Sequence, residues 1–449
     1  MVIGQPKAEQ TNSQRNYYIS VTIIGIFFFI FGFVTWLNGI LIPYLKIACE
    51  LSDFQALFVA FAFYISYTIM ALPSSWILKK TGFKKGMTAG LWVMALGTLI
   101  FVPAAWTRTY GIFLTGLFVL GTGLAILQTA SNPYITIIGP SETAARRISI
   151  MGICNKLAGA VAPLILVYFI LHDGDAFIQS LKSMDGTEKM MALDSLARRV
   201  IAPYLVMTVT LFLLGIFIRF TPLPEIETET GNETAQNDRP GKSSIFQFPH
   251  LILGVLTIFF YVGVEVIAGD TVIRYGLSLG VPLESAKYFT SLVLVAMVLG
   301  YLLGIILIPR ILSQKNLLLI SAVAGLILTM GALFVSPDVS MVFPFIDLTT
   351  FQHVDLIIPL TVFFVALLGL ANAIVWPAVW PLAIHDLGSF LKTGSALLIM
   401  GIAGGAILPV IWGYLSDVWS AQQAYWLAIP CYLFILYFAG HGYKVRNWT

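Results

Sequence analysis

Three ionisable residues, Lys156, Glu265 and Asp270, lie within long apolar segments of the sequence. A charged side chain is costly inside a bilayer, so residues of this kind mark an ion or substrate pathway by default. Glu265, in YVGVEVIAG, could take up a proton on one side of a membrane and release it on the other. The alternative is a glutamate that is permanently paired with a cation or a hydroxyl and so fixes helix packing.

Lys156, in MGICNKLAGAVAP, needs a partner if it is buried, and Glu265 is one candidate. The ammonium could bind ligand hydroxyls or act as a fixed positive charge in place of a coupling cation. The alternative is that its long stem carries the charge to the membrane edge. Asp270 is a second candidate for ion coupling, but it lies near the outer end of its segment, where a surface salt bridge with Arg274 is the favoured interpretation.

Amides and tryptophans recur in the same apolar segments. Amides match pairs of hydroxyls on a neutral sugar, and tryptophan rings can cover the C–H face of the sugar ring. Trp376 and Trp380 are four residues apart, on one face of a helix that Pro377 and Pro381 are expected to break locally. Hydrogen bonds between helices, or a lipid-facing ring, are the alternatives. The predicted substrate-binding residues are Asn38, Gln128, Asn132, Asn155, Lys156, Glu265, Asn372, Trp376 and Trp380.

These residues have to be positioned by membrane helices. The 449 residues are 58% hydrophobic and 10% charged, whereas a soluble protein carries about 25% charged residues. A bilayer span takes about 20 residues, and its backbone polar groups are satisfied internally only in a helix or a closed barrel. The sequence therefore predicts an all-α membrane protein with twelve spans, at 18–45, 52–78, 87–106, 110–138, 147–171, 201–220, 250–275, 286–309, 316–336, 355–384, 393–415 and 424–442.

The same composition excludes other classes. A net charge of +3 is too small for a nucleic-acid partner. The three cysteines form no disulfide framework and no metal spacing, and no motif of ATP binding or catalysis is present. We therefore expect no enzyme activity, no catalytic residue, no bound metal and no cofactor other than a coupling ion, proton or sodium.

Basic residues set the orientation and the domain plan. They concentrate near residues 79–85 and 444–446, which by the positive-inside rule places both termini in the cytoplasm of a cell inner membrane. Residues 172–199 should form an outer segment with a short amphipathic helix. The predicted parts are a tail at 1–17, a six-helix half at 18–220, a cytoplasmic linker at 221–249, a second half at 250–443 and a tail at 444–449.

The two halves resemble each other. FGFVTWLNG, at 31–39, aligns with YVGVEVIAGD, so that Gly39 corresponds to Asp270, 231 positions later. Farther along, Gln128 and Asn132 correspond to Trp376 and Trp380, each 248 positions apart. Two repeated six-helix halves with a substrate site between them are typical of alternating-access transporters.

Four stretches also resemble a known family: LNGILIPYLK, PSSWILKKTGFKKG, GLAILQTASNPYITIIGP and FYVGVEV. They are similar to the fucose–galactose–glucose/proton symporters of the major facilitator superfamily, and the resemblance runs from the first span to the last. It implies sugar transport, and a glutamate at position 265 that serves the sugar. It also implies an aspartate after the span 1 asparagine and a glutamate in span 4, but Gly39 and Gln128 stand there and cannot take up a proton.

We therefore expect a secondary active transporter that imports a hexose such as glucose or galactose with a proton or sodium ion, and that works in the bilayer as a monomer. The missing carboxylates keep an uncoupled sugar facilitator open. An exporter of the same fold for another solute, or a sugar sensor that signals through the linker, are further alternatives.

Overall fold

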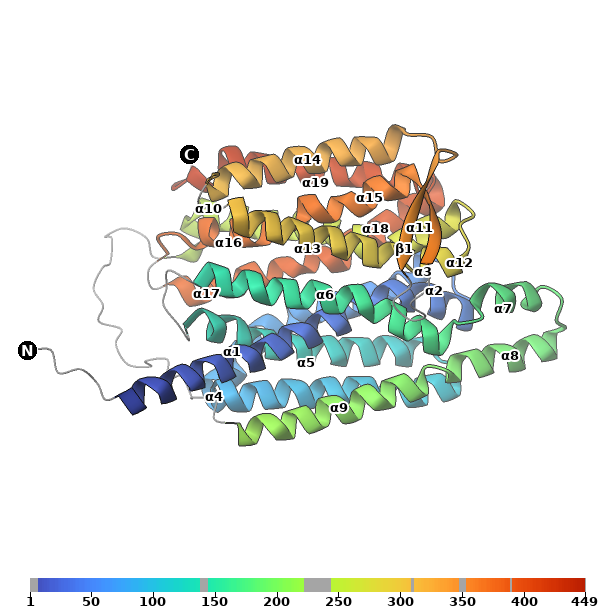
Figure 1. Ribbon diagram of the computed structural model, residues 1–449, viewed down its shortest axis with the longest axis horizontal. Coiled ribbons are helices and arrows are strands. Elements are labelled where there is room, and N and C mark those ends of the chain that lie inside the picture. The colour runs from blue at the N-terminus through green and yellow to red at the C-terminus, as the bar shows by residue number, and fades with distance from the viewer. Residues whose placement is uncertain are drawn as a thin grey trace, which may run out of the picture.

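Figure 1 shows the computed structural model of the chain, a bundle of long helices. The structure describes residues 7–137, 144–221, 244–307, 311–346, 353–387 and 390–448. The start of the first helix and the last described residues lie at one end of the bundle. Helices α7 (Gly174–Leu181) and α8 (Gly186–Arg198) lie at the other end (Figure 1), which we call the far end.

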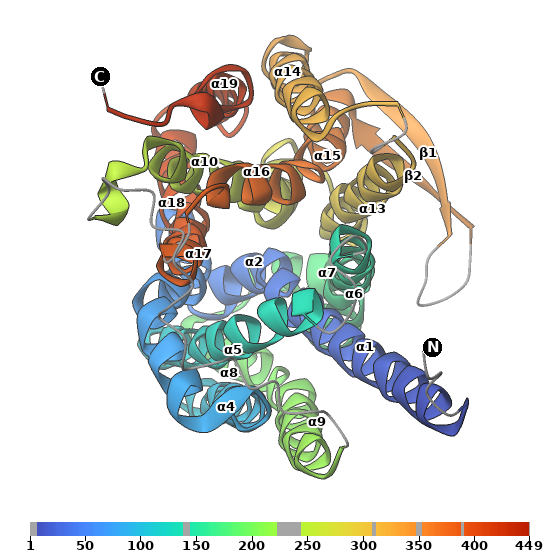
Figure 2. The same ribbon diagram turned by 90° about the vertical axis from the view of Figure 1, so that its left-hand side faces the viewer.

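Helices of the first half gather on one side of the molecule and those of the second half on the other (Figure 2). The first half also contains α1 (Lys7–Trp36), α2 (Asn38–Ala48), α3 (Asp53–Ala56), α4 (Phe58–Thr107), α5 (Tyr110–Ile137), α6 (Ala144–Ile170) and α9 (Ile201–Phe220). The second half begins with η2 (Ile245–Gln247), α10 (Pro249–Asp270), α11 (Val272–Ser278), α12 (Leu283–Ala286), α13 (Phe289–Leu307) and α14 (Gln314–Phe334). It continues with β1 (Ser340–Ile346), β2 (His353–Pro359), α15 (Leu360–Asn372), α16 (Val375–Ile384), α17 (Leu391–Met400), η4 (Gly401–Ala403), α18 (Gly404–Val418), η5 (Gln423–Leu427), α19 (Ala428–Gly440) and η6 (Gly442–Lys444).

The prediction of twelve spans is confirmed, because the described residues contain twelve helical segments that are long and apolar enough to cross a membrane. Their outward faces stay apolar; on α9, for example, Val206, Val209 and Leu213 are all exposed. Such faces suit a lipid environment and would be unfavourable in water. The predicted boundaries of the halves stay a prediction, and most of the linker at 221–249 falls outside the described residues.

Several spans are interrupted, and three of the interruptions lie next to predicted site residues. Span 1 breaks at Leu37, between α1 and α2, and span 7 breaks at Thr271, between α10 and α11. Span 10 breaks at 373–374, between α15 and α16. Interrupted helices occur inside membranes only where protein or a water-filled cavity surrounds the freed backbone groups. In transporters, interruptions of this kind are found where substrates and ions bind.

Two expectations about these helices need correction. Pro381 lies inside α16 without ending it, and the break of span 10 comes earlier, just before Pro377. Because Pro377 has no N–H, it cannot bond the carbonyl of Ala373, which is where the helix is interrupted. Spans 2 and 3 are separate helices, as predicted, and α4 covers both of them, with a kink at Gly82, whose φ of 76° is a conformation that glycine adopts readily; span 3, however, begins at Lys80 and not at residue 87.

The far end also differs from the prediction. Residues 355–359 were expected to begin span 10 but form β2, which pairs antiparallel with β1, Val342 opposite Ile357. Leu356 and Ile358 are buried whereas Ile357 is exposed, the alternation of a strand with one covered face. The outer segment 172–199 forms two helices, α7 and α8, instead of the single short helix expected.

The halves contact each other along several helices. α6 packs against α13, α4 against α17 and α18, and α2 against both α10 and α11. The contacts of α2 matter most for the site, because they bring the break in span 1 against the break in span 7. Two of the predicted residues, Asn38 and Asp270, lie directly beside these breaks.

Candidate substrate and ion site

Lys156 and Glu265 form a buried ion pair between the two halves. Lys156 lies on α6 and Glu265 on α10, and the Lys156 Nζ donates a hydrogen bond to Glu265 Oε1. Both residues are more than nine-tenths buried, with 8% and 7% exposed. Lys156 therefore has the partner that we expected. The alternative, in which its side chain carries the charge to the membrane edge, is wrong.

Aromatic residues surround this pair. The Lys156 ammonium lies 4.6 Å from the centroid of the Trp36 ring, a cation–π contact. The Tyr261 hydroxyl, one helical turn before Glu265 on α10, also interacts with the Glu265 carboxylate. Neither Trp36 nor Tyr261 was among the predicted residues. Trp36 could have been found from the sequence, since it lies two residues before Asn38 in the repeated FGFVTWLNG motif.

Polar groups at the break in span 1 are buried near the contact between the halves. Asn38 is 1% exposed, and neither its amide nitrogen nor its amide oxygen has a hydrogen-bond partner among the described residues. The Trp36 Nε1 is likewise buried without a partner there. Buried polar groups are normally satisfied, by water or a ligand where protein does not serve. The hydrogen-bond donors and acceptor of Asn38 and Trp36 are therefore available to bind a polar ligand.

Asp270 is not in the surface salt bridge that we expected. Arg274 instead donates to Asp417 Oδ1 at 2.9 Å and to Ser416 Oγ at 3.2 Å. Asp270 is only 1% exposed, and the groups that act on it are Glu265, Lys156 and the hydroxyl of Tyr64. The prediction is wrong because Asp270 ends α10 and points into the junction of the halves, whereas Arg274 lies one turn farther on, in α11.

The remaining amides are spread more widely. Gln128 Nε2 donates to the Tyr67 hydroxyl at 3.2 Å. Asn155 Nδ2 donates to the Phe28 carbonyl at 3.3 Å, a bond between α6 and α1 that accords with the packing interpretation. Asn372 is fully buried; it accepts a bond from Tyr432 at 2.8 Å, and its Nδ2 has no partner among the described residues. The side chain of Asn132 lies outside the described part of the structure.

Trp376 and Trp380 share one face of α16, as predicted. Their rings stack with centroids 5.4 Å apart and an interplanar angle of 30°. The centroid of Tyr261 lies 6.4 Å from that of Trp376, which links the tryptophan pair to the neighbourhood of Glu265. Both tryptophans are half-buried, so part of each ring stays accessible.

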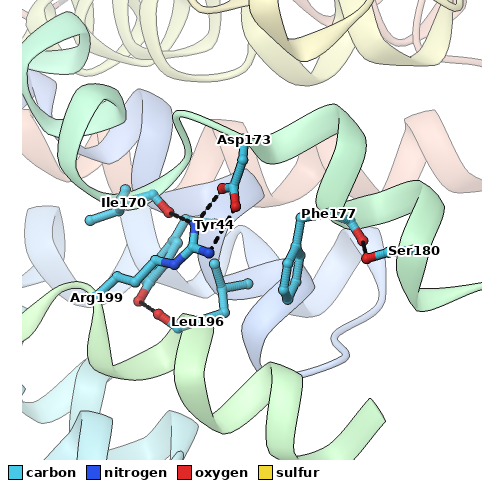
Figure 3. A network of polar contacts seen from close by, with 7 residues as sticks. All are labelled: Tyr44, Ile170, Asp173, Phe177, Ser180, Leu196 and Arg199. Carbon is cyan, nitrogen blue, oxygen red and sulfur yellow. Dashed lines mark hydrogen bonds and ion pairs between the residues drawn. The ribbon is translucent and has the colours of Figure 1, made fainter. Parts of the chain in front are cut away.

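A polar network stiffens the far end of the first half (Figure 3). The Tyr44 hydroxyl on α2 reaches the carbonyls of Leu196 and Ala197 on α8 at 2.9 and 3.0 Å. Arg199 binds both carboxylate oxygens of Asp173, one of them from Nη2 at 2.9 Å. These hydrogen bonds hold the pKa of the Asp173 carboxyl below its usual range. The network ties α2, which begins directly after the break at Leu37, to α8.

A second set of bonds joins the halves at this end. The Asp175 carboxylate of α7 accepts hydrogen bonds from the backbone N–H groups of Leu283 and Glu284, both at 3.0 Å. A pocket of about 530 Å³ lies nearby between α2, α11 and α18, lined by Lys46, Leu277 and Asp417 among others. The far end of the interface is thus held together by specific contacts.

Twelve apolar spans in two repeated halves, with ionised and polar groups buried where the halves meet, define a multi-pass membrane protein built as a transporter. The sequence profile of the Major Facilitator Superfamily matches residues 24–396, and the chain belongs to that superfamily.

Relatives of known description extend over almost the whole chain. The chain is 34% identical over 441 residues to a glucose/galactose transporter of Brucella abortus biovar 1 (strain 9-941), with 98% of each chain covered. It is 28% identical over 440 residues to the L-fucose-proton symporter of Escherichia coli (strain K12), with 96% and 94% covered. Among solved structures, the superfamily transporter FucP in its outward conformation matches with a TM-score of 0.71 and 25% identity, covering 97% of this chain and 100% of that one.

Proposed function

We propose that the chain imports a monosaccharide, a hexose such as glucose or galactose, together with a coupling cation by alternating access. The observation that carries this proposal is the buried Lys156–Glu265 pair, which joins the two halves beside unsatisfied polar groups and an accessible aromatic surface. A sugar bound there would be held by both halves at once, so their relative movement would transfer it from one side of the membrane to the other.

The chemistry of the site suits a neutral sugar. Asn38, Lys156 and Glu265 offer donors and acceptors for hydroxyl pairs, and Gln128 and Asn372 add amides from other helices. Trp376 and Trp380 offer a flat surface for the C–H face of the ring. The names of two relatives, a glucose/galactose transporter and an L-fucose-proton symporter, support a monosaccharide and, in the second case, a proton.

The coupling cation is a proton or a sodium ion, and Glu265 and Asp270 are the acidic groups that would bind it. We place the chain in the bacterial inner membrane as a monomer, with both termini and the linker in the cytoplasm, in keeping with the basic residues that cluster at that end. The far end then faces the outside. We assign the chain no catalytic activity and no other cofactor, since transport needs only binding and a conformational change.

Counterflow in proteoliposomes tests this function without assuming a coupling ion. Vesicles loaded with unlabelled glucose or galactose should transiently concentrate the labelled sugar, and vesicles without protein should not. A panel of hexoses as competitors then ranks the substrates. Absence of counterflow with every monosaccharide in the panel would refute the proposal and favour an exporter of another solute.

A further inference from the structure

The two acids at the junction of the halves, Glu265 and Asp270, differ in their hydrogen bonding. Glu265 is bound to the ammonium of Lys156. Asp270 is 1% exposed, and neither of its carboxylate oxygens makes a hydrogen bond of normal geometry to any described residue. A buried carboxylate that lacks hydrogen-bond donors is very unfavourable as an anion, whereas its neutral acid is much less so.

The groups that face Asp270 do not supply a second cation. They are the Tyr64 hydroxyl from α4, Lys156 from α6 and Glu265 from its own helix, while Arg274 is directed to Asp417. Among these groups there is one positive charge and there are two carboxyl groups. Because Lys156 already neutralises Glu265, the cluster is electrically neutral when Asp270 holds a proton and carries one negative charge when Asp270 does not.

The repeat places Asp270 close to the axis that relates the two halves. Its counterpart in the first half is Gly39, and a Cβ atom at Gly39 would lie 3.5 Å from the carbonyl oxygen of Gly269. Counterparts that meet in this way lie close to the pseudo-twofold axis between the halves. The Thr290 hydroxyl, 2.9 Å from the same Cβ position, already donates to the Gly269 carbonyl at 2.7 Å. Gly39 thus lets α2 approach α10 and Thr290 closely, because a side chain at 39 would collide with Thr290, and the second half supplies the carboxyl group at this point.

We propose that Asp270 is the group that binds and releases the coupling proton, an inference that rests on the proposed sugar import. The proton passes from external water to an Asp270 carboxylate oxygen, travels there while the sugar is bound, and leaves to cytoplasmic water. On uptake, an O–H bond of a hydronium ion breaks as the carboxyl O–H bond forms, and on release the carboxyl O–H bond breaks as a cytoplasmic water becomes hydronium. The break at Thr271 directly follows Asp270, so the residue lies where the helix can bend.

The geometry favours a proton over a sodium ion. A hard metal cation is held by several oxygen ligands arranged around it. The Asp270 oxygens make no hydrogen bond of normal geometry among the described residues, and the polar groups that act on them are one tyrosine hydroxyl and an ion pair, fewer oxygen ligands than a sodium ion requires. A proton needs only the one carboxyl group. Glu265, held by Lys156, then serves the sugar and the contact between the halves.

The test measures proton movement and sugar exchange separately. Weakly buffered proteoliposomes containing a pH-sensitive dye, clamped with potassium and valinomycin, receive glucose or the hexose that counterflow identifies. Wild-type protein should acidify the lumen on addition of the sugar. Asp270→Asn should reduce this signal at least tenfold and reduce counterflow by a much smaller factor. Asp270→Glu, which keeps the carboxyl group, should retain proton movement.

The outcomes separate the two proposals. Wild-type counterflow without proton movement, sugar accumulation under an inward sodium gradient alone, or undiminished proton movement in Asp270→Asn would each overturn the role of Asp270. Equal loss of counterflow and proton movement in both Asp270 variants would assign the residue a structural role instead. Absence of counterflow in the wild type would refute the proposed function itself, and this inference with it.

Discussion

The ammonium of Lys156 is hydrogen-bonded to the carboxylate of Glu265, although the two residues are 109 positions apart and belong to opposite halves. Each half therefore contributes one charge of the pair, and each charge is paired only while the two halves are in contact here. Any movement that separates the halves at this point has to provide new partners, either water or hydroxyl groups of a bound sugar. This dependence is what makes the pair suited to a binding site that opens alternately to each side.

Breaking this pair on one side should destabilise the protein more than removing it altogether. Glu265→Gln removes the carboxylate that is hydrogen-bonded to the buried Lys156 ammonium, at a cost of about 3–5 kcal/mol. The double variant Lys156→Gln, Glu265→Gln should recover most of that loss. Thermal unfolding of the wild type, both single variants and the double variant in one detergent measures the interaction. If the loss in the double variant equals the sum of the two single losses, the two residues do not interact.

The tryptophan pair on α16 should contribute to sugar affinity. Trp376→Ala removes the ring that stacks on Trp380 and approaches Tyr261, so we expect the sugar concentration for half-maximal counterflow to rise about tenfold or more. Trp376→Phe should lose less, because an aromatic surface remains. Trp106→Ala is the matched control, since that ring is 63% exposed at the end of α4 and should leave transport unchanged. Equal effects of Trp376→Ala and Trp106→Ala would remove Trp376 from the site.

The bonds from Asp175 should keep the far end of the interface closed. Asp175→Ala removes the acceptor for the Leu283 and Glu284 amides, so hydrogen exchange of a peptide over 281–288 should accelerate several-fold. Asp185→Ala provides the control, because the Asp185 carboxylate binds the Thr187 and Glu188 amides of its own helix and joins no halves. If both variants leave the 281–288 peptide as protected as in the wild type, Asp175 does not hold this end closed.

The Asp173–Arg199 pair should make stability depend on acid pH. Because Arg199 holds the pKa of Asp173 low, the pair stabilises the folded state above the unfolded pKa of about 3.9. That stabilisation is lost as the pH falls from there through the lowered folded pKa. Melting temperatures of wild type and Asp173→Asn should therefore differ at pH 6 and converge at the acid end. Asp194→Asn, which removes an exposed partner of Arg108, should shift the melting temperature little at any pH.

What the sequence predicted well is local. Each span can be recognised from the length of its own apolar segment, so all twelve were predicted. The partner of Lys156 was foreseen because a buried ammonium requires an acid, and few acids lie in the apolar segments. The stacked face of Trp376 and Trp380 follows directly from helical spacing.

What it missed depends on packing between distant segments. The burial of Asp270 follows from the contact of α2 with α10, which the nearness of Arg274 in the sequence concealed. The strand β2 was taken for the start of a span because its residues are apolar enough to continue the helix. Tyr261 was one of many aromatic residues, and only its proximity to Glu265 and Trp376 distinguishes it.

The most direct test of the whole account is accumulation of labelled hexose by wild-type proteoliposomes under an imposed inward proton gradient, compared with vesicles at equal pH. The account predicts that the sugar rises transiently above its external concentration under the gradient and reaches only that concentration without it. Equilibration to the same level in both conditions would contradict gradient-driven import and leave an uncoupled sugar facilitator.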